Sequence, residues 1–130
     1  MDEDFKAECD RIRAEGRRLC ASWRIATKST YRGTLKLVKG LIQETVSRVI
    51  AAECLTCVFT FNPRHERIYK RLLNMRTVAR RGGSINGLNN APAVFMRWDL
   101  ESCPDTWLRT AEERARRDSA RKASTRLVAA

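Results

Sequence analysis

The clearest pattern along the chain is a helical repeat of apolar positions between residues 35 and 53. Apolar side chains recur there at steps of three and four, which places them on one face of an α-helix. These positions are Leu35, Val38, Leu41, Ile42, Val46, Val49 and Ile50. The same spacing relates Phe5, Cys9 and Ile12 and, with acidic residues in the first turn, predicts a shorter helix over residues 2–16.

Three segments have the pattern of β-strands. Residues 17–27, "RRLCASWRIAT", are rich in side chains that favour strands. Residues 54–61, "CLTCVFTF", form a continuous apolar run, which is typical of a buried strand. Residues 91–100, "APAVFMRWDL", are predicted as the third strand. One face of this third strand is expected to carry Val94, Met96 and Trp98.

A second short helix is predicted over residues 63–74, directly after the second strand. Asn62 is a good N-cap and Pro63 is a good first helical residue. Residues 28–33 are predicted to form a polar turn. Residues 80–90, "RRGGSINGLNN", are predicted to form a loop or hairpin, because glycine and asparagine tolerate positive φ.

The order of these elements indicates the fold class. Strand, helix and strand across residues 17–61 have the length of a right-handed crossover between parallel strands. We therefore expect an α+β fold with an α/β-like core, in which helices cover a sheet over residues 1–104. Residues 105–130 hold seven basic and four acidic side chains and few large apolar ones. This composition predicts a marginal, solvent-exposed helix or a frayed basic tail.

Net charge narrows the range of partners. The formal charge of +11 favours an acidic partner, such as nucleic acid, an anionic membrane, a phosphorylated cofactor or an acidic protein. No segment approaches the roughly 20 apolar residues of a membrane span. The five cysteines are odd in number and no secretory signal precedes them. Reduced thiols in a cytoplasmic protein are therefore expected.

Cys54 and Cys57 form a C-x-x-C pair inside the second predicted strand. Positions three apart on a strand point to opposite faces, which disfavours a redox pair. A zinc site would need two further ligands that the spacing does not supply. We therefore interpret both residues as small apolar core residues and predict no metal site.

Two segments that follow predicted strands are candidates for chemistry. Arg32 and Gly33 precede the long helix, where free backbone N–H groups and a glycine suit an anion, although a generic turn is the simpler interpretation. The chain's only histidine, His65, lies in the first turn of the short helix, and Tyr69 follows one turn later. From the residues alone, a surface histidine and a packed tyrosine are favoured over a catalytic pair.

Five segments in a fixed order resemble a known family. They are "RRLCASWRIAT", "YRG", the long helix, "FNPRHERIYKRLLNM" and "NNAPAVFMRWDL". Together they are similar to the long-chain N-acyl amino acid synthases, which are related to acyl-homoserine-lactone synthases and GNAT acyltransferases. The similarity covers roughly residues 13–100. It implies a GNAT-like fold without its N-terminal strands, and transfer of a fatty acyl group from a thioester to an amino acid amine.

The same resemblance implies roles for particular residues. Tyr69 matches the tyrosine that donates a proton to the departing thiolate, and Arg24 matches an arginine of the first strand. Where relatives carry a glutamate three positions before that arginine, this chain has Ala21. The positions implied in binding the acyl-phosphopantetheine donor are Arg32, Gly33, Asn62, Arg64 and His65. The donor is a substrate, on an acyl carrier protein or coenzyme A, and no tightly bound cofactor is implied.

A basic segment suggests how the donor is presented. Between residues 64 and 81, seven Arg and Lys accompany a single acid, Glu66. An acidic acyl carrier protein would be attracted to such a surface, although a solvated basic helix face is an equal alternative. A small nucleic-acid-binding protein is the rival function, supported by the charge but by no recognisable motif. A truncated or inactive chain is a further alternative.

Overall fold

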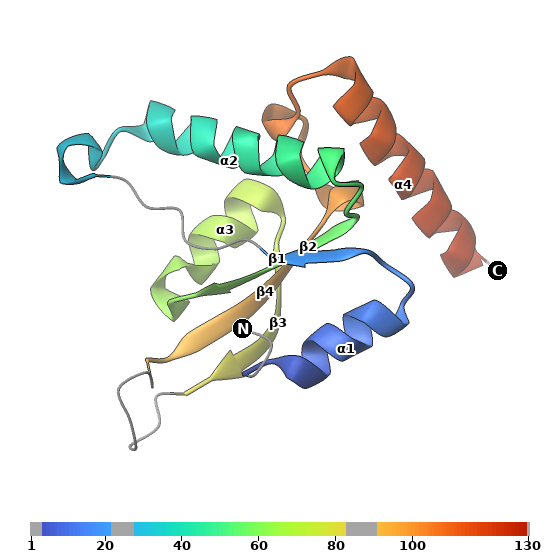
Figure 1. The fold of residues 1–130 in the computed structure, drawn as a ribbon, viewed down its shortest axis with the longest axis horizontal. Coiled ribbons are helices and arrows are strands. Elements are labelled where there is room, and N and C mark those ends of the chain that lie inside the picture. Colours follow the sequence, from blue (N-terminus) through green and yellow to red (C-terminus); the bar gives the residue numbers. More distant parts are fainter. Residues whose placement is uncertain (1–3, 22–27, 83–90, 130) are drawn as a thin grey trace.

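The computed structural model describes residues 4–21, 28–82 and 91–129. Helices and strands alternate along most of this range, and four strands form one sheet in the order β1-β2-β4-β3 (Figure 1). In chain order the elements are α1 (Lys6–Ala14), β1 (Leu19–Ala21), α2 (Leu35–Ala51), β2 (Thr56–Phe61), α3 (Glu66–Leu73), β3 (Arg76–Arg81), β4 (Ala93–Asp99) and α4 (Ala111–Ala129). Single 3₁₀ turns at Ser29–Tyr31 and Pro63–His65 precede α2 and α3.

The pairing of the strands confirms the predicted crossover. β1 and β2 are parallel, and α2 connects them. β4 pairs antiparallel with β2 on one side and with β3 on the other. The predicted α+β fold class is therefore confirmed.

β3 is the element that the sequence pattern missed. Arg80 and Arg81, which we predicted in a loop or hairpin, end this strand, and residues 83–90 of that prediction lie outside the described range. The strand lies at the edge of the sheet and carries three arginines. Charged residues suit an exposed edge because they discourage pairing with other chains, and they hide the apolar alternation of a strand.

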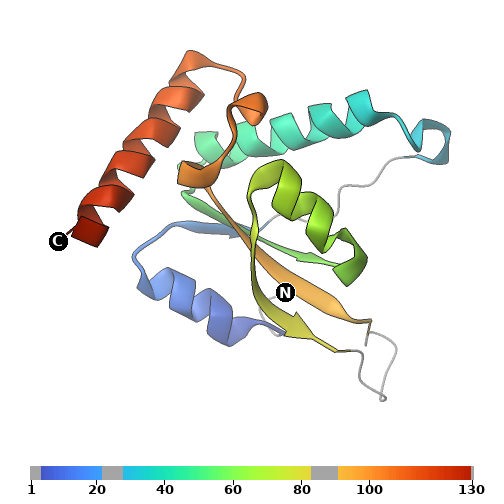
Figure 2. The same ribbon diagram turned by 180° about the vertical axis from the view of Figure 1, so that it is seen from behind.

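Helices cover both faces of the sheet, as both views of the ribbon show (Figures 1 and 2). α1 packs on one face, where Phe5 stacks on Phe95 with ring centroids 4.8 Å apart. α2 and α3 pack on the opposite face of the sheet and enclose the larger of the two apolar cores. Alternation along β4 divides the two cores, since Phe95 faces α1 whereas the predicted set of Val94, Met96 and Trp98 faces α2 and α3.

The C-terminal segment is helical and packed against the body of the protein. Thr110 and Glu113 form a capping box, in which the Glu113 carboxylate accepts the backbone N–H of Thr110 at 3.3 Å and the Glu113 N–H donates to Thr110 Oγ1 at 3.1 Å. Arg117 is buried and donates to the Cys103 carbonyl at 3.2 Å. Of the two forms predicted for residues 105–130, the structure shows the helix. None of the helices in the described ranges is long and apolar enough to cross a membrane.

Candidate functional site

The site begins at the C-terminal end of β2. In the described part of the chain, β1 pairs with β2 only as far as Ala21 opposite Val58, whereas β2 continues to Phe61. The last residues of β2 therefore extend beyond this paired part. After the 3₁₀ turn Pro63–His65, α3 returns across the face of the sheet that α2 also covers (Figure 1).

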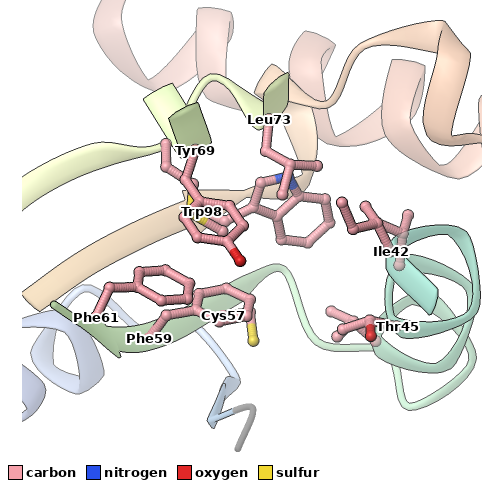
Figure 3. A pocket seen from close by; sticks show the side chains of 11 residues that line it. Ile42, Thr45, Cys57, Phe59, Phe61, Tyr69, Leu73 and Trp98 are labelled. Atoms are coloured by element: carbon pink, nitrogen blue, oxygen red, sulfur yellow. The ribbon is translucent and has the colours of Figure 1, made fainter. Parts of the chain in front are cut away.

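An apolar pocket lies on this face, between β2, β4, α2 and α3 (Figure 3). Its lining residues are Ile42, Thr45, Val46, Val49, Cys57, Phe59, Phe61, Tyr69, Leu73, Met75 and Trp98. The cavity has a volume of about 20 Å³. That is close to the space that one water molecule requires, so an acyl chain enters only if the lining side chains move apart.

Tyr69 forms one side of the pocket. Its ring stacks on Phe61, with centroids 4.1 Å apart and planes inclined by 13°. Phe61 in turn stacks on Phe59 at 5.5 Å. The Tyr69 hydroxyl points into the pocket (Figure 3). Burial raises the pKa of Tyr69 above its ordinary value, so the phenol stays protonated at neutral pH and is able to donate a proton.

Trp98 contributes an unsatisfied donor beside the same pocket. The residue is only 2% exposed, and its Nε1 has no hydrogen-bond partner among the described residues. A buried N–H without a partner costs about 1–3 kcal/mol. This N–H is buried, so an acceptor oxygen would reach it only if the neighbouring side chains move apart.

The residues at the end of β2 hold one another in a compact turn. Asn62 is the predicted N-cap, and its Oδ1 accepts the backbone N–H of Arg64 at 3.1 Å. The Arg64 Nε donates to Nε2 of His65 at 3.1 Å. This contact makes the His65 Nε2 an acceptor, which requires the proton of a neutral ring to lie on Nδ1.

Glu66 fastens the start of α3 to β3. Its carboxylate accepts from Lys70 at 2.7 Å and from Arg80 at 2.6 Å, and it also accepts the hydroxyl of Thr77. These hydrogen bonds, with that of Lys70 contributing most, lower the pKa of Glu66 to about 2. The basic segment is therefore partly neutralised from within, because Lys70 and Arg80 both pair with Glu66.

Arg32 and Gly33 lie at the exposed start of α2. Gly33 has a φ of +86°, a conformation that a residue with a side chain rarely adopts. Thr34, the N-cap, provides no side-chain cap, and the first turn of α2 contains no acidic residue. The start of this long helix therefore presents free N–H groups and positive charge to solvent.

The structure gathers only part of the predicted site. Asn62, Arg64, His65 and Tyr69 lie on one continuous segment. No hydrogen bond or ion pair joins the described residues of this group to Arg32 or Gly33. Arg24 lies outside the described residues, so its predicted role is not addressed, and Ala21 is exposed at the end of β1.

Two pocket residues were not anticipated from the sequence. Thr45 lies on the apolar face of α2 and is the one hydroxyl in that stripe. Cys57 lies at the base of the pocket, although we interpreted it only as a core residue. The sequence places both residues within otherwise apolar patterns. Thr45 lies three positions after Ile42 on the helix, and Cys57 lies two positions before Phe59 on the strand.

The comparison with solved structures identifies the fold of the protein. "The structure of FeeM, an N-acyl amino acid synthase from uncultured soil microbes" matches with a TM-score of 0.61 at 20% sequence identity. The match covers 76% of this chain and 52% of that chain, so this chain spans about half the length of the FeeM structure. The protein therefore has an acyltransferase fold. A comparison with curated protein sequences found no match.

The family follows from the sequence itself. The family model described as "N-acyl amino acid synthase FeeM" matches residues 1–99, which is most of the chain. The chain belongs to this family. The resemblance predicted from the motifs around Asn62 and Tyr69 is thereby confirmed.

Proposed function

We propose that this chain transfers a long-chain acyl group from a thioester to the amine of an amino acid. The position of Tyr69 supports this function most directly. A protonated phenol lies at an apolar pocket, beside the C-terminal end of β2. The family and the fold agree with such a reaction, since FeeM, whose structure this chain resembles, is an N-acyl amino acid synthase.

In the proposed reaction the amine nitrogen attacks the thioester carbonyl carbon. An N–C bond forms, the C–S bond breaks, and the electron pair of that bond leaves with the donor sulfur. Tyr69 donates its phenolic proton to the departing thiolate and is reprotonated from water. The amine must also lose a proton. Position 21 carries an alanine rather than an acid, so in this proposal the proton passes to water.

The donor arm would lie along the turn at the end of β2. Asn62 uses its Oδ1 to cap the helix, which leaves its side-chain N–H groups for a pantetheine carbonyl. His65 and Arg64 lie beside it. A phosphate of the donor would suit the start of α2, where Arg32, Gly33 and free helical N–H groups are exposed.

We propose an acidic acyl carrier protein as the donor's carrier, with coenzyme A as the alternative. Arg67 and Arg71 on α3 are exposed and form no ion pair with any residue in the described ranges. Ile68 and Leu72 lie on the same helix and are 52% and 37% exposed. An apolar centre with cationic neighbours is a suitable docking surface for an acidic protein.

The carrier proposal is tested by charge reversal. The double variant Arg67→Glu/Arg71→Glu should weaken binding of a long-chain acyl carrier protein about tenfold at low salt, and added salt should reduce this difference. Lys122→Glu, an exposed change on α4, is the control and should have little effect. Equal binding by all three proteins would reject this surface, and preferential binding of duplex DNA to it would favour the nucleic-acid function instead.

The activity itself is tested by product formation. The protein is incubated with a long-chain acyl thioester, on carrier protein or coenzyme A, and a mixture of amino acids. Mass spectrometry should detect N-acyl amino acids. Tyr69→Phe should lower kcat by at least about 10²-fold while KM changes little. Tyr31→Phe removes the chain's other tyrosine hydroxyl, which is exposed, and serves as the matched control.

The outcomes separate two claims. No product from the wild-type chain with either donor would reject the proposed activity. Product formation with unchanged kcat in Tyr69→Phe would retain the activity and remove the role of Tyr69 as the acid.

A further inference from the structure

Three of the five cysteines gather at the β1 side of the sheet. Cys20 on β1 is the direct partner of Cys57 on β2 in the parallel register. Cys54 does not lie on a strand, because β2 starts at Thr56, and it is buried in the same core as Cys57. The expectation that Cys54 and Cys57 point to opposite faces of a strand was therefore wrong. Their interpretation as core residues is confirmed by their burial.

Cys20 and Cys57 are placed for a covalent link. Directly opposite residues on neighbouring strands have side chains on the same face, with Cα atoms about 4.8 Å apart. A disulfide accommodates Cα separations of about 4.4–6.8 Å. Both side chains also line one cavity of about 280 Å³ between β1 and α2.

The two thiols differ in access to solvent. β1 is an edge strand of the described sheet, and Cys20 is half-buried there. Arg48, which pairs with Glu44 at 2.8 Å, lines the same cavity. Cys57 is fully buried at 0% exposure. A small oxidant therefore reaches Cys20 first, and Cys57 lies behind it.

Hydrogen bonding favours the thiolate form of Cys20. Chiefly through its hydrogen bond with Cys57, and also with Cys54, the pKa of Cys20 is lowered to about 7. Burial raises the pKa of Cys54 instead. The thiolate is the form that reacts with peroxides, so Cys20 combines access with reactivity. Across the described ranges, no group of His, Cys, Asp and Glu side chains is arranged to hold a metal ion.

We propose that Cys20 and Cys57 form a peroxide-sensitive dithiol that closes to a disulfide between β1 and β2. The Cys20 sulfur attacks hydrogen peroxide, the O–O bond breaks, and a sulfenic acid and one water form. The Cys57 thiol then attacks the sulfenic sulfur, forms the S–S bond and releases a second water. The two sulfurs supply the two electrons that reduce the peroxide, and an external dithiol reverses the change.

The disulfide would act on the apolar pocket, a consequence that rests on the proposed function. Cys57 lines that pocket together with Phe59 and Tyr69. Linking Cys57 to Cys20 holds β1 and β2 together one position before Ala21 and Val58, two residues before Phe59 of the pocket. The pocket must open to admit an acyl chain, so the oxidised chain should transfer acyl groups more slowly.

The modification is tested by peptide mapping. The reduced protein is exposed to hydrogen peroxide, remaining thiols are alkylated, and peptides are identified by mass spectrometry. We expect alkylatable thiols to fall from five to three, with Cys20 and Cys57 in one linked peptide that dithiothreitol releases. Cys57→Ala should leave Cys20 as a sulfenic acid that dimedone traps, and Cys20→Ser should leave Cys57 reduced.

Controls make the assignment specific. Cys103→Ala removes a buried thiol in another part of the core and should leave the linked peptide unchanged. A link from Cys20 to Cys54, a link between two chains, or equal oxidation in Cys20→Ser would each overturn the proposal. The mapping needs no activity, so it stands apart from the proposed function. If the reduced protein is active and the disulfide-linked protein transfers acyl groups at the same rate, the proposed effect of the disulfide on the pocket is wrong.

Discussion

The two faces of the sheet are held by different kinds of contact. On the α1 face, Arg97 is 5% exposed and forms two hydrogen bonds to Glu15, at 2.9 and 2.8 Å, and one to Asp99 at 2.7 Å. Arg17 extends this network with two hydrogen bonds to Glu101. On the α2 and α3 face, aromatic side chains surround a small void, and one indole N–H lacks a partner within the described ranges.

This contrast separates stability from function. Charged groups taken out of water are costly unless they are paired, and those on the α1 face are paired. The opposite face leaves a donor and a small space unfilled, and its contacts are mainly apolar and less directional. We infer that the α1 face fixes the position of the strands, whereas the α2 and α3 face adapts to a ligand.

The largest expected effect comes from removing the hydrogen bonds of Arg97 on the α1 face. Arg97→Met keeps most of the side-chain volume but removes the cation that pairs with Glu15, while Asp99 keeps Arg17 and Arg76 as partners. The free energy of unfolding, measured with urea, should fall by about 3 kcal/mol because three hydrogen bonds to charged groups are lost. Arg11→Met on the outer side of α1 removes an exposed arginine and should change it by less than about 0.5 kcal/mol. Similar losses in both variants would contradict the contrast between buried and exposed pairs.

A smaller effect should come from filling the pocket on the other face. Thr45→Phe places a ring in the space beside Tyr69, at a cost of about 1–3 kcal/mol in stability. In the proposed reaction, kcat/KM should fall more for a palmitoyl donor than for a butyryl donor, because the longer chain needs the space. Lys39→Phe, on the exposed side of α2, is the control. An equal fall for both donors would place the acyl chain elsewhere.

The smallest expected effect concerns the hydrogen bonds of Glu66, which connect the start of α3 to β3. The folded-state pKa of Glu66, about 2, lies below the ordinary value of 4.5, so the unfolded chain binds this proton more readily. Its stabilising contribution is present above about pH 4.5 and is lost as pH falls toward about 2. Glu66→Gln should therefore show a smaller fall in Tm across this window, and Glu112→Gln on α4 is the control. Identical pH profiles for Glu66→Gln and the wild type would contradict the assigned pKa.

Periodicity and capping predicted the elements that place Tyr69. The apolar spacing of α2, the apolar run of β2 and the Asn62-Pro63 start of the next helix are local features. α2 begins at the predicted residue, β2 begins two residues later than predicted, at Thr56, and Asn62-Pro63 starts a 3₁₀ turn that leads into α3. They succeeded because local propensity and burial favour the same structure in these segments. The α+β fold followed from their order.

Contacts between distant segments could not be predicted in this way. The pairing of Arg97 with Glu15 spans 82 positions, and the register of Cys20 with Cys57 depends on how two strands align. Neither contact can be inferred from the local spacing of apolar and polar residues. β3 was missed because its exposed arginines conceal its alternation, and the closed state of the pocket depends on how Phe61 and Tyr69 stack.

The central claim is that the α2 and α3 face receives the acyl chain, and a bound-state structure tests it most directly. The protein would be crystallised with a non-hydrolysable long-chain acyl-pantetheine thioether. We predict that the chain lies between Phe61 and Trp98, with the sulfur within hydrogen-bonding distance of the Tyr69 hydroxyl and the contacts of Arg97 unchanged. An acyl chain bound on the α1 face, or bound with the pocket still closed, would contradict this account.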